Sequence, residues 1–158
     1  MIAVFLGLLH LEIVKERLER EFNLALITTS PSVSYEILKT NGEILLISSP
    51  AELPERTEIA EIREPFTRLE VVTPGKFIGN IMELVQSRRG VYKNTSYLDE
   101  ERAVLSYECP LSEIVTDFYD RLKSTSSGYA SVNYELIGYR AENLVKVDVL
   151  INGEPFDT

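Results

Sequence analysis

The sequence is short of residues that metal sites, disulfides and many catalytic sites require, with one cysteine, one histidine and no tryptophan in 158 residues. A single cysteine, Cys109, excludes an internal disulfide, and a site built on histidine and cysteine would need carboxylates to complete it. Cys109 alternates with Tyr107 on a predicted strand, so it is most simply a small buried apolar residue. His10 lies in the first turn of a predicted helix, where a structural hydrogen bond is a simpler interpretation than a ligand or a base.

Long apolar runs and catalytic motifs are also absent. No run approaches the roughly 20 residues that a membrane-spanning helix needs, and the first nine residues lack the basic start and cleavage site of a signal peptide. The sequence contains no phosphate loop, dinucleotide fingerprint, serine-hydrolase elbow or zinc-protease motif. Carboxylates are numerous, but no pair is singled out for acid–base chemistry. We therefore predict a cytoplasmic chain with no catalytic residues and no metal site.

Charge is mainly of one sign, because 25 Asp and Glu residues outnumber 16 Lys and Arg residues and give a formal net charge of −9. Nucleic-acid binding depends on many contacts between cations and phosphates, so this balance argues against a general nucleic-acid binder. Any such role must be local. The 44% hydrophobic and 26% charged composition is typical of a globular protein, and the length allows one sizeable domain plus a fragment.

The first part of the chain predicts a helix followed by strands. Apolar residues recur at three- and four-residue spacing from Leu8 to Phe22, which indicates an amphipathic helix. Two short apolar runs, 33–37 and 43–47, flank Asn41-Gly42 and predict a hairpin. Residues 1–48 therefore form a partial α/β unit. Residues 49–63, rich in proline and glutamate, are predicted to be a linker.

Residues 64–143 alternate between strand and helix patterns in the order βαββαβ. After a strand around 68–72, a helix pattern opens at Thr73-Pro74-Gly75 and stops at Gly90. Strands 91–98 and 102–109 form a predicted hairpin, a second helix carries Leu111, Ile114, Val115, Phe118 and Leu122, and a strand covers 130–136. This order predicts an α+β fold of the ferredoxin-like split βαβ type, with an antiparallel sheet and both helices on one face.

Both ends of the chain look incomplete. Alternating apolar residues from Val145 to Ile151 predict a strand that reaches the turn signal Asn152-Gly153, but only five residues remain for its partner. One helix and one hairpin at the other end are too few to enclose a core. We therefore expect a piece of a longer protein, in which 144–158 begin a further domain. Exposed edges of the first unit predict local disorder or pairing with a second copy.

Basic residues at loop ends are the main candidates for a binding site in this acidic chain. We expect the C-terminal ends of both helices to lie at the same end of the sheet, where cations and a serine-rich loop would form one patch for a phosphate backbone. Cations in a last helical turn also stabilise the helix dipole, so a purely structural role is an alternative. The candidates are Arg88, Arg89, Lys93, Arg121, Lys123, Ser124, Ser126, Tyr129 and Arg140.

Several long motifs resemble one family. Residues 5–22, read as FLGLLHLEIVKERLEREF, resemble the G-x-x-H-L-E-I…R-L-x-R-E-F helix of translocase GTPases related to elongation factor G. Five further segments resemble the LepA branch, elongation factor 4. They are Thr73-Pro-Gly75, Ser87-Arg-Arg-Gly90, the stretch from Asp117 to Ser131, Gly138-Tyr-Arg140 and residues 144–154. Residues 1–4 depart from the Arg-Cys-Gly that the family tends to carry before Phe-Leu-Gly.

The resemblance implies a ribosome-binding fragment of a translational GTPase that promotes back-translocation or remodels stalled ribosomes. It implies that 1–48 are part of the third domain, 64–143 the elongation-factor-G fifth-like domain, and 144–158 the start of the LepA-specific C-terminal domain. No cofactor belongs to this chain; GTP and Mg²⁺ would bind a missing N-terminal domain. Partners would be ribosomal RNA and ribosomal proteins, with tRNA as an option through the missing C-terminal domain. The location would be the cytoplasm, with a peripheral position on the bacterial inner membrane as an option.

Two other hypotheses come from different classes. Split βαβ folds host many functions, so the chain could be a ligand- or protein-interaction module, which predicts an apolar pocket and binding that does not depend on salt. It could also be an enzyme, such as an acyl phosphate hydrolase. The sequence offers no convincing Arg/Asn cradle for the phosphate of that substrate.

Overall fold

The computed structural model describes residues 8–22, 32–147, 150–151 and 154–155. The chain divides into two compact units, residues 1–30 and 31–158. In the first unit, helix α1 spans Leu8–Phe22, which confirms the helix predicted from the apolar spacing. Ion pairs four residues apart, such as Glu16 with Arg20, lie along its exposed surface. Residues 1–4 and the His10 side chain lie outside the described residues.

The predicted hairpin is confirmed in the second unit. Strands β1 (Tyr35–Lys39) and β2 (Ile44–Ile47) pair antiparallel. Gly42 has a backbone φ of 87°, which residues other than glycine rarely adopt. The Asn41 carboxamide oxygen accepts a 2.9 Å hydrogen bond from the backbone N–H of Glu43. Asn41 and Gly42 therefore supply the turn that their sequence pattern predicted.

Strand β3 (Ile59–Pro74) begins inside the predicted linker. Short 3-10 turns, η1 (Pro50–Glu52) and η2 (Arg56–Glu58), precede it, and the first is capped by Ser49. From Ile59 onward the backbone pairs with β1, where Ile62 lies opposite the buried Ile37. The linker prediction is therefore wrong from Ile59, because ladder hydrogen bonds rather than a dense apolar pattern hold this segment. The predicted boundaries at 48 and 63 both fall inside the second compact unit.

The sheet has the strand order of the predicted fold. Strands β4 (Val91–Tyr97), β5 (Arg102–Pro110) and β6 (Ser131–Ala141) give the antiparallel order β6-β3-β5-β4. Arg63 pairs with β1 and β6, whereas Phe66 pairs with β5 and β6. Strands β1 and β5 therefore follow one another along one edge of β3, and β6 takes the other edge. The split βαβ arrangement is confirmed, and β3 joins it to the hairpin.

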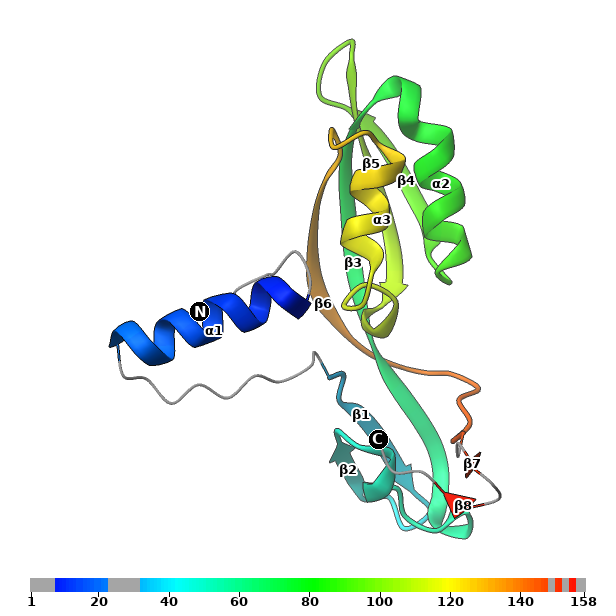
Figure 1. Cartoon of the computed structure of the whole chain (residues 1–158). Coiled ribbons are helices and arrows are strands. Elements are labelled where there is room, and N and C mark those ends of the chain that lie inside the picture. The colour runs from blue at the N-terminus through cyan, green and yellow to red at the C-terminus, as the bar shows by residue number, and fades with distance from the viewer. Residues whose placement is uncertain (1–7, 23–31, 148–149, 152–153, 156–158) are drawn as a thin grey trace. The chain divides into compact units, whose positions relative to one another are not determined.

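Two helices cover one face of this sheet (Figure 1). Helix α2 spans Ile78–Ser87 after a 3-10 turn, η3 (Gly75–Phe77), and helix α3 spans Phe118–Thr125. The predicted second helix is shorter than expected, since Leu111 lies in a 3-10 turn, η4 (Leu111–Glu113), and 114–117 form a turn. Ile114 is nevertheless buried. The apolar residues before Phe118 therefore indicated which side chains are buried, and not that the backbone there is an α-helix.

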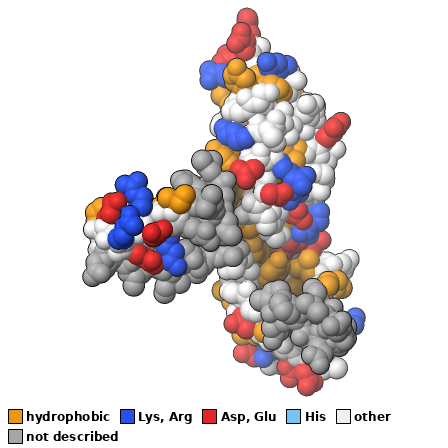
Figure 2. Space-filling model, in the orientation of Figure 1, with side chains coloured by type: hydrophobic (Ala, Val, Ile, Leu, Met, Phe, Trp, Pro, Cys, Tyr) orange, Lys and Arg blue, Asp and Glu red, His pale blue; other side chains and the backbone are white. Residues whose placement is uncertain are grey.

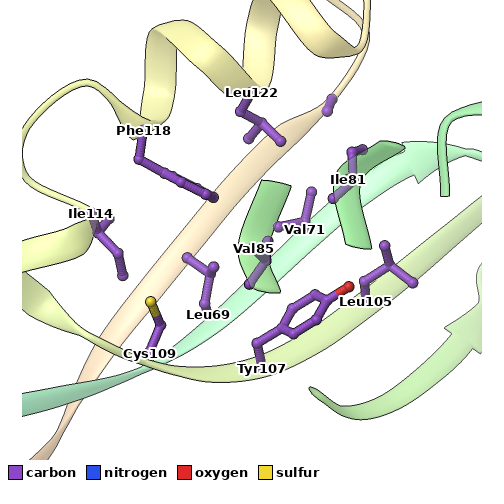
Figure 3. Close-up of a cluster of buried hydrophobic side chains, with 11 residues drawn as sticks. Leu69, Val71, Ile81, Val85, Leu105, Tyr107, Cys109, Ile114, Phe118 and Leu122 are labelled. Atoms are coloured by element: carbon purple, nitrogen blue, oxygen red, sulfur yellow. The ribbon is translucent and has the colours of Figure 1, made fainter. Parts of the chain in front are cut away.

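The core lies between this helical layer and the sheet (Figure 3). It takes side chains from β3, β5, α2, α3 and the turn before α3. Cys109 is among them, and burial raises the pKa of its thiol to about 12, which confirms the prediction of a small buried apolar residue. The fully buried members are Leu69, Val71, Ile81, Val85, Leu105, Tyr107, Cys109, Phe118, Leu122 and Ala130, with Ile114 nearly so.

The predicted strand near the C-terminus is largely wrong. Residues 142–147 have no regular structure, and Val145 and Val147 are exposed. A two-stranded ladder forms instead between β7 (Leu150–Ile151) and β8 (Glu154–Pro155). The turn signal at 152–153 lies outside the described residues. Alternation alone did not produce a strand at 145–147, where the described structure provides no pairing strand.

Candidate functional site

The two helices run antiparallel, so the predicted single basic patch is wrong. The Arg88 guanidinium after the end of α2 lies 2.5 Å from the Asp117 carboxylate at the start of α3. At the opposite end, the rings of Phe77 and Tyr129 stack with centroids 6.2 Å apart. Helices α2 and α3 follow β3 and β5, which run in opposite directions, so the helices do too. The C-terminal ends of the helices therefore lie at opposite ends of the sheet.

The first end holds an arginine–carboxylate cluster, which comprises Arg88, Arg89, Arg121, Glu64, Glu113 and Asp117. Arg89 binds Glu64 through Nη1 to Oε1 at 2.6 Å and Nη2 to Oε2 at 3.1 Å, and its Nε lies 2.9 Å from Glu113. Arg121 Nε lies 2.6 Å from the second Asp117 oxygen. Each cation in the cluster is matched by a carboxylate. Three of the predicted RNA contacts are therefore partners in ion pairs within the fold.

Backbone geometry places Arg89 in this cluster. The N–H of Gly90 donates to the Val85 carbonyl at 2.9 Å, and Arg89 between them has a φ of 56°. This is the Schellman ending of a helix, in which glycine usually occupies the position of Arg89. A Cβ on Gly90 would lie 2.3 Å from Val85 Cγ1. The helix therefore ends tightly, and the ion pairs of Arg89 accompany an unfavourable backbone conformation.

Electrostatic effects in the cluster follow the contacts. Hydrogen bonds from Arg121 and then Arg88 lower the pKa of Asp117 to about 2. The hydrogen bond that Arg89 donates to Glu64 raises the pKa of Arg89, and Glu113 adds to that effect. Both shifts favour the charged forms. Asp117 and Arg89 are therefore held as an anion and a cation by their partners in the cluster.

Lys93 and Arg140 bind one carboxylate, that of Glu108, on the sheet face away from the helices. Tyr107 and Cys109 face the core, so Glu108 between them faces the other side. Its Oε2 lies 2.9 Å from Lys93 Nζ and 2.7 Å from Arg140 Nη1. Hydrogen bonds from Arg140 and Lys93 lower the pKa of Glu108. These two predicted contacts therefore share one carboxylate.

The remaining candidates lie in the loop after α3. Ser126 is buried, and its hydroxyl donates to the Leu122 carbonyl at 2.7 Å and accepts from the Ala130 N–H at 3.0 Å. The exposed Ser124 hydroxyl donates to the Arg121 carbonyl. Lys123 Nζ donates to the Ala130 carbonyl at 2.7 Å. Ser126 therefore holds the loop in shape, whereas Tyr129 is 67% exposed.

Two residues that the sequence did not single out join Tyr129. The Phe77 ring stacks on Tyr129, and Lys76 Nζ lies 4.9 Å from the Phe77 centroid and 5.5 Å from the Tyr129 centroid. We call Lys76, Phe77, Lys123 and Tyr129 the loop end. Figure 2 shows Lys and Arg side chains on both sides of hydrophobic ones at the upper end of this view. Only the Pro74-Gly75 helix-start signal could have drawn attention to Lys76.

Acidic and sulfur-bearing side chains do not gather into a metal site in the described ranges. Residues 8–22, 32–147, 150–151 and 154–155 contain no group of three or more His, Cys, Asp or Glu side chains that could hold a metal ion. None of the helices in those ranges is long and apolar enough to cross a membrane.

Comparisons with known proteins agree on one family. Residues 61–150 match the model for the elongation factor G C-terminus. Elongation factor 4 from Acetivibrio thermocellus is 55% identical over 153 residues, which cover 97% of this chain and 25% of that protein. Elongation factor 4 from Thermosynechococcus vestitus is 56% identical over 98% of this chain and 26% of that protein. The chain thus spans about a quarter of the length of the relatives it matches.

One solved structure, a crystal structure of a protein from Thermus thermophilus, matches with a TM-score of 0.48 and 24% sequence identity. The match covers 52% of this chain and 12% of the other.

Proposed function

Because the chain belongs to the elongation factor G C-terminus family, we propose that it is a ribosome-binding segment of a translational GTPase of the elongation factor 4 type. The observation that carries this proposal is the 55% identity with elongation factor 4 over 97% of the chain. An elongation factor acts on the translating ribosome, so the ribosome is the partner that the relatives' name supports. Cytoplasmic location is part of the proposal.

In this proposal the chain contributes binding and the transmission of movement rather than chemistry. GTP and Mg²⁺ would be held by a domain outside the matched quarter of the relatives. Back-translocation or the remodelling of stalled ribosomes would be the activity of the whole factor, with tRNA contact through a further domain. A peripheral position on the inner membrane stays a prediction of the resemblance alone.

The described contacts rank the predicted RNA-binding residues. Five of the predicted residues form an ion pair with a carboxylate: Arg88, Arg89, Lys93, Arg121 and Arg140. A phosphate would have to compete with that carboxylate. In the described part of the chain, neither Lys76 nor Lys123 forms an ion pair, so a phosphate would not have to displace a carboxylate from either of them. We therefore propose the loop end, rather than the arginine–carboxylate cluster, as the main RNA contact.

Co-sedimentation with bacterial ribosomes at low and moderate salt tests the proposal. We expect the 158-residue chain to pellet with ribosomes, and to pellet less at moderate salt because cation–phosphate contacts release counterions. Intact elongation factor 4 from Acetivibrio thermocellus, added in excess, should displace the chain. Absence of the chain from the ribosome pellet at both salt concentrations would contradict the proposal.

A further inference from the structure

Tyr129 presents an unusually open aromatic ring on a fixed loop. Its side chain is 67% exposed, while the Phe77 ring stacks against it at an interplanar angle of 23°. Phe77 in turn packs against the core. An exposed ring that the fold holds in place can stack against another flat group. Because the ring is already ordered, binding does not carry the entropy cost of ordering it.

The loop that carries Tyr129 is held from both sides. Ser127 and Gly128 have φ values of 53° and 84°, so the chain turns sharply there. The Tyr129 N–H donates to the Ser126 carbonyl at 3.0 Å, and the Gly128 N–H donates to the Lys123 carbonyl at 2.7 Å. These bonds and the buried Ser126 hydroxyl fix the position of the ring relative to α3.

Two cations lie beside this platform. Lys76 Nζ is 5.5 Å from the Tyr129 centroid, and Lys123 Nζ reaches the Gly128 carbonyl at 3.3 Å, next to Tyr129 in the chain. The acidic turn between β4 and β5 approaches the same end, since the Gly75 N–H donates to the Glu101 carbonyl at 2.9 Å. In the order β6-β3-β5-β4 that turn lies on the β4 side, whereas Lys123 lies on the β6 side. A phosphate backbone would therefore run along the α3 and β6 side.

The open face of the sheet is a weaker candidate. Domains of this strand order that bind RNA on the sheet stack bases on exposed aromatic side chains of the central strands. Here β3 and β5 place Arg68, Glu70, Ser106 and Glu108 on the open face. None of these four is aromatic, and Arg68 is paired with Glu135.

We propose that the loop end binds an unpaired RNA base, which stacks on Tyr129 while Lys76 and Lys123 contact the neighbouring phosphates. Single-stranded RNA is commonly bound by this combination of an aromatic face and cations. The inference rests on the proposed function, because it names the contact through which the chain would bind ribosomal RNA. It adds Lys76 and Phe77 to the residues predicted from the sequence and assigns Tyr129 the stacking role.

Ribosome co-sedimentation of matched variants tests the stacking role. Tyr129→Ala should weaken binding roughly 5- to 150-fold, the loss typical of one stacked base. Tyr129→Phe keeps the ring and should bind within about twofold of the unaltered chain. Tyr97→Ala is the control, because Tyr97 is equally exposed, at 69%, but lies on β4, away from the α3 and β6 side. Thermal melting of each variant would show that all remain folded.

Salt dependence tests the cations. The double variant Lys76→Ala/Lys123→Ala should reduce the slope of log affinity against log salt by about 1.4, or about 0.7 for each lost contact with single-stranded RNA. Binding that depends on Tyr129 but not on salt would indicate a protein partner and overturn the proposal. Equal binding by Tyr129→Ala and the unaltered chain would also overturn it, while leaving ribosome binding itself intact.

A separate probe decides the inference if the chain fails to bind ribosomes. A labelled single-stranded RNA made of adenylates alone can be titrated with the full chain and followed by fluorescence anisotropy. Binding that Tyr129→Ala reduces and Tyr97→Ala does not would support the stacking site even though the proposed function had failed. No binding of this RNA, together with no ribosome binding, would overturn it.

Discussion

The Arg89 guanidinium donates two hydrogen bonds, of 2.6 and 3.1 Å, to the Glu64 carboxylate, although the Glu64 side chain is only 1% exposed. A buried carboxylate without a partner is costly, whereas a paired one is tolerated. Arg89 is 45% exposed, so this pair connects a buried site in β3 with the surface at the end of α2. The pair therefore holds the helix end against the sheet.

Replacing Arg89 by alanine should lower the free energy of unfolding by about 3 kcal/mol. The variant leaves the buried Glu64 carboxyl group without its arginine partner, and the loss lies at the low end of the range for buried pairs because water can reach the vacated position. Urea unfolding measures the change. A loss below about 1 kcal/mol, which is usual for surface pairs, would contradict the assignment of Glu64 as a buried charge.

The double variant Glu64→Gln/Arg89→Ala is the matched control. Because glutamine carries no charge, removing Arg89 from it should cost at least about 1 kcal/mol less than removing Arg89 from the unaltered chain. Additive effects of the two substitutions would show that the residues do not act as a pair.

Gly90→Ala should be strongly destabilising, by about 2–3 kcal/mol. A Cβ at this position would lie 2.3 Å from Val85 Cγ1 and 2.7 Å from the Val85 carbonyl oxygen, and the backbone atom cannot move without opening the helix end. Gly79→Ala in α2 is the control, because beyond its chain neighbours and the backbone of its own helix nothing lies within 4 Å of its added Cβ. Alanine is the better helix former, so Gly79→Ala should stabilise by up to about 1 kcal/mol. Equal effects at the two glycines would contradict the described helix end.

Most elements of the fold could be predicted because their signals are local. The three- and four-residue spacing of apolar residues, the Asn41-Gly42 turn and the alternation in β5 can each be recognised from residues that are close in the sequence. The start of β3 could not be predicted in this way, because residues from Ile59 become a strand by pairing with β1 across the chain. The same limit applies to 145–147, where alternation was present but no strand formed.

The candidate site was predicted less well, for a reason of topology. Residue types at loop ends were recognised, but whether two helix ends meet depends on the direction of the strands that precede them. Partner choice was also invisible, since Arg89 pairs with Glu64 and Arg140 pairs with Glu108, each far away along the chain. Lys76 was missed because its importance comes only from its distance to Tyr129.

Tyr107→Phe should leave stability unchanged or raise it by up to about 1 kcal/mol. The Tyr107 hydroxyl is buried in the core cluster and finds no hydrogen-bond partner among the described residues, so removing it relieves an unsatisfied group. Tyr92→Phe is the control, since the Tyr92 hydroxyl donates to Thr95 at 3.0 Å and its loss should cost a few tenths of a kcal/mol. Guanidinium unfolding of both variants decides the matter. A clear loss of stability in Tyr107→Phe would reveal a bond that the structure does not contain.

Cys109 should react with thiol reagents only when the fold opens. Burial raises its pKa to about 12, so almost no thiolate exists at neutral pH, and its Sγ donates to the Arg88 carbonyl at 3.2 Å. We expect labelling of the native chain to be at least about 100-fold slower than labelling in denaturant. Gly90→Ala, which weakens the helix end beside Arg88, should accelerate native labelling. A native rate close to the denatured rate would show that the core is open around β5.

Asp117 should make the stability of the chain fall with acid in a defined window. Its pKa is lowered from 3.8 to about 2 by Arg121 and then Arg88, so the folded state holds the charged form more strongly than the unfolded state does. The stabilising contribution is therefore fully present above about pH 4, declines as pH falls toward about 2, and is absent below both pKa values. Melting temperatures of Asp117→Asn and the unaltered chain should differ most above about pH 4 and converge near about pH 2. Asp120→Asn is the control, because in the described residues Asp120 forms no ion pair although it lies on the same helix. If the Asp117→Asn difference stayed constant from about pH 5 to about pH 2, the carboxylate would have no altered pKa and the link from α2 to α3 would not be electrostatic.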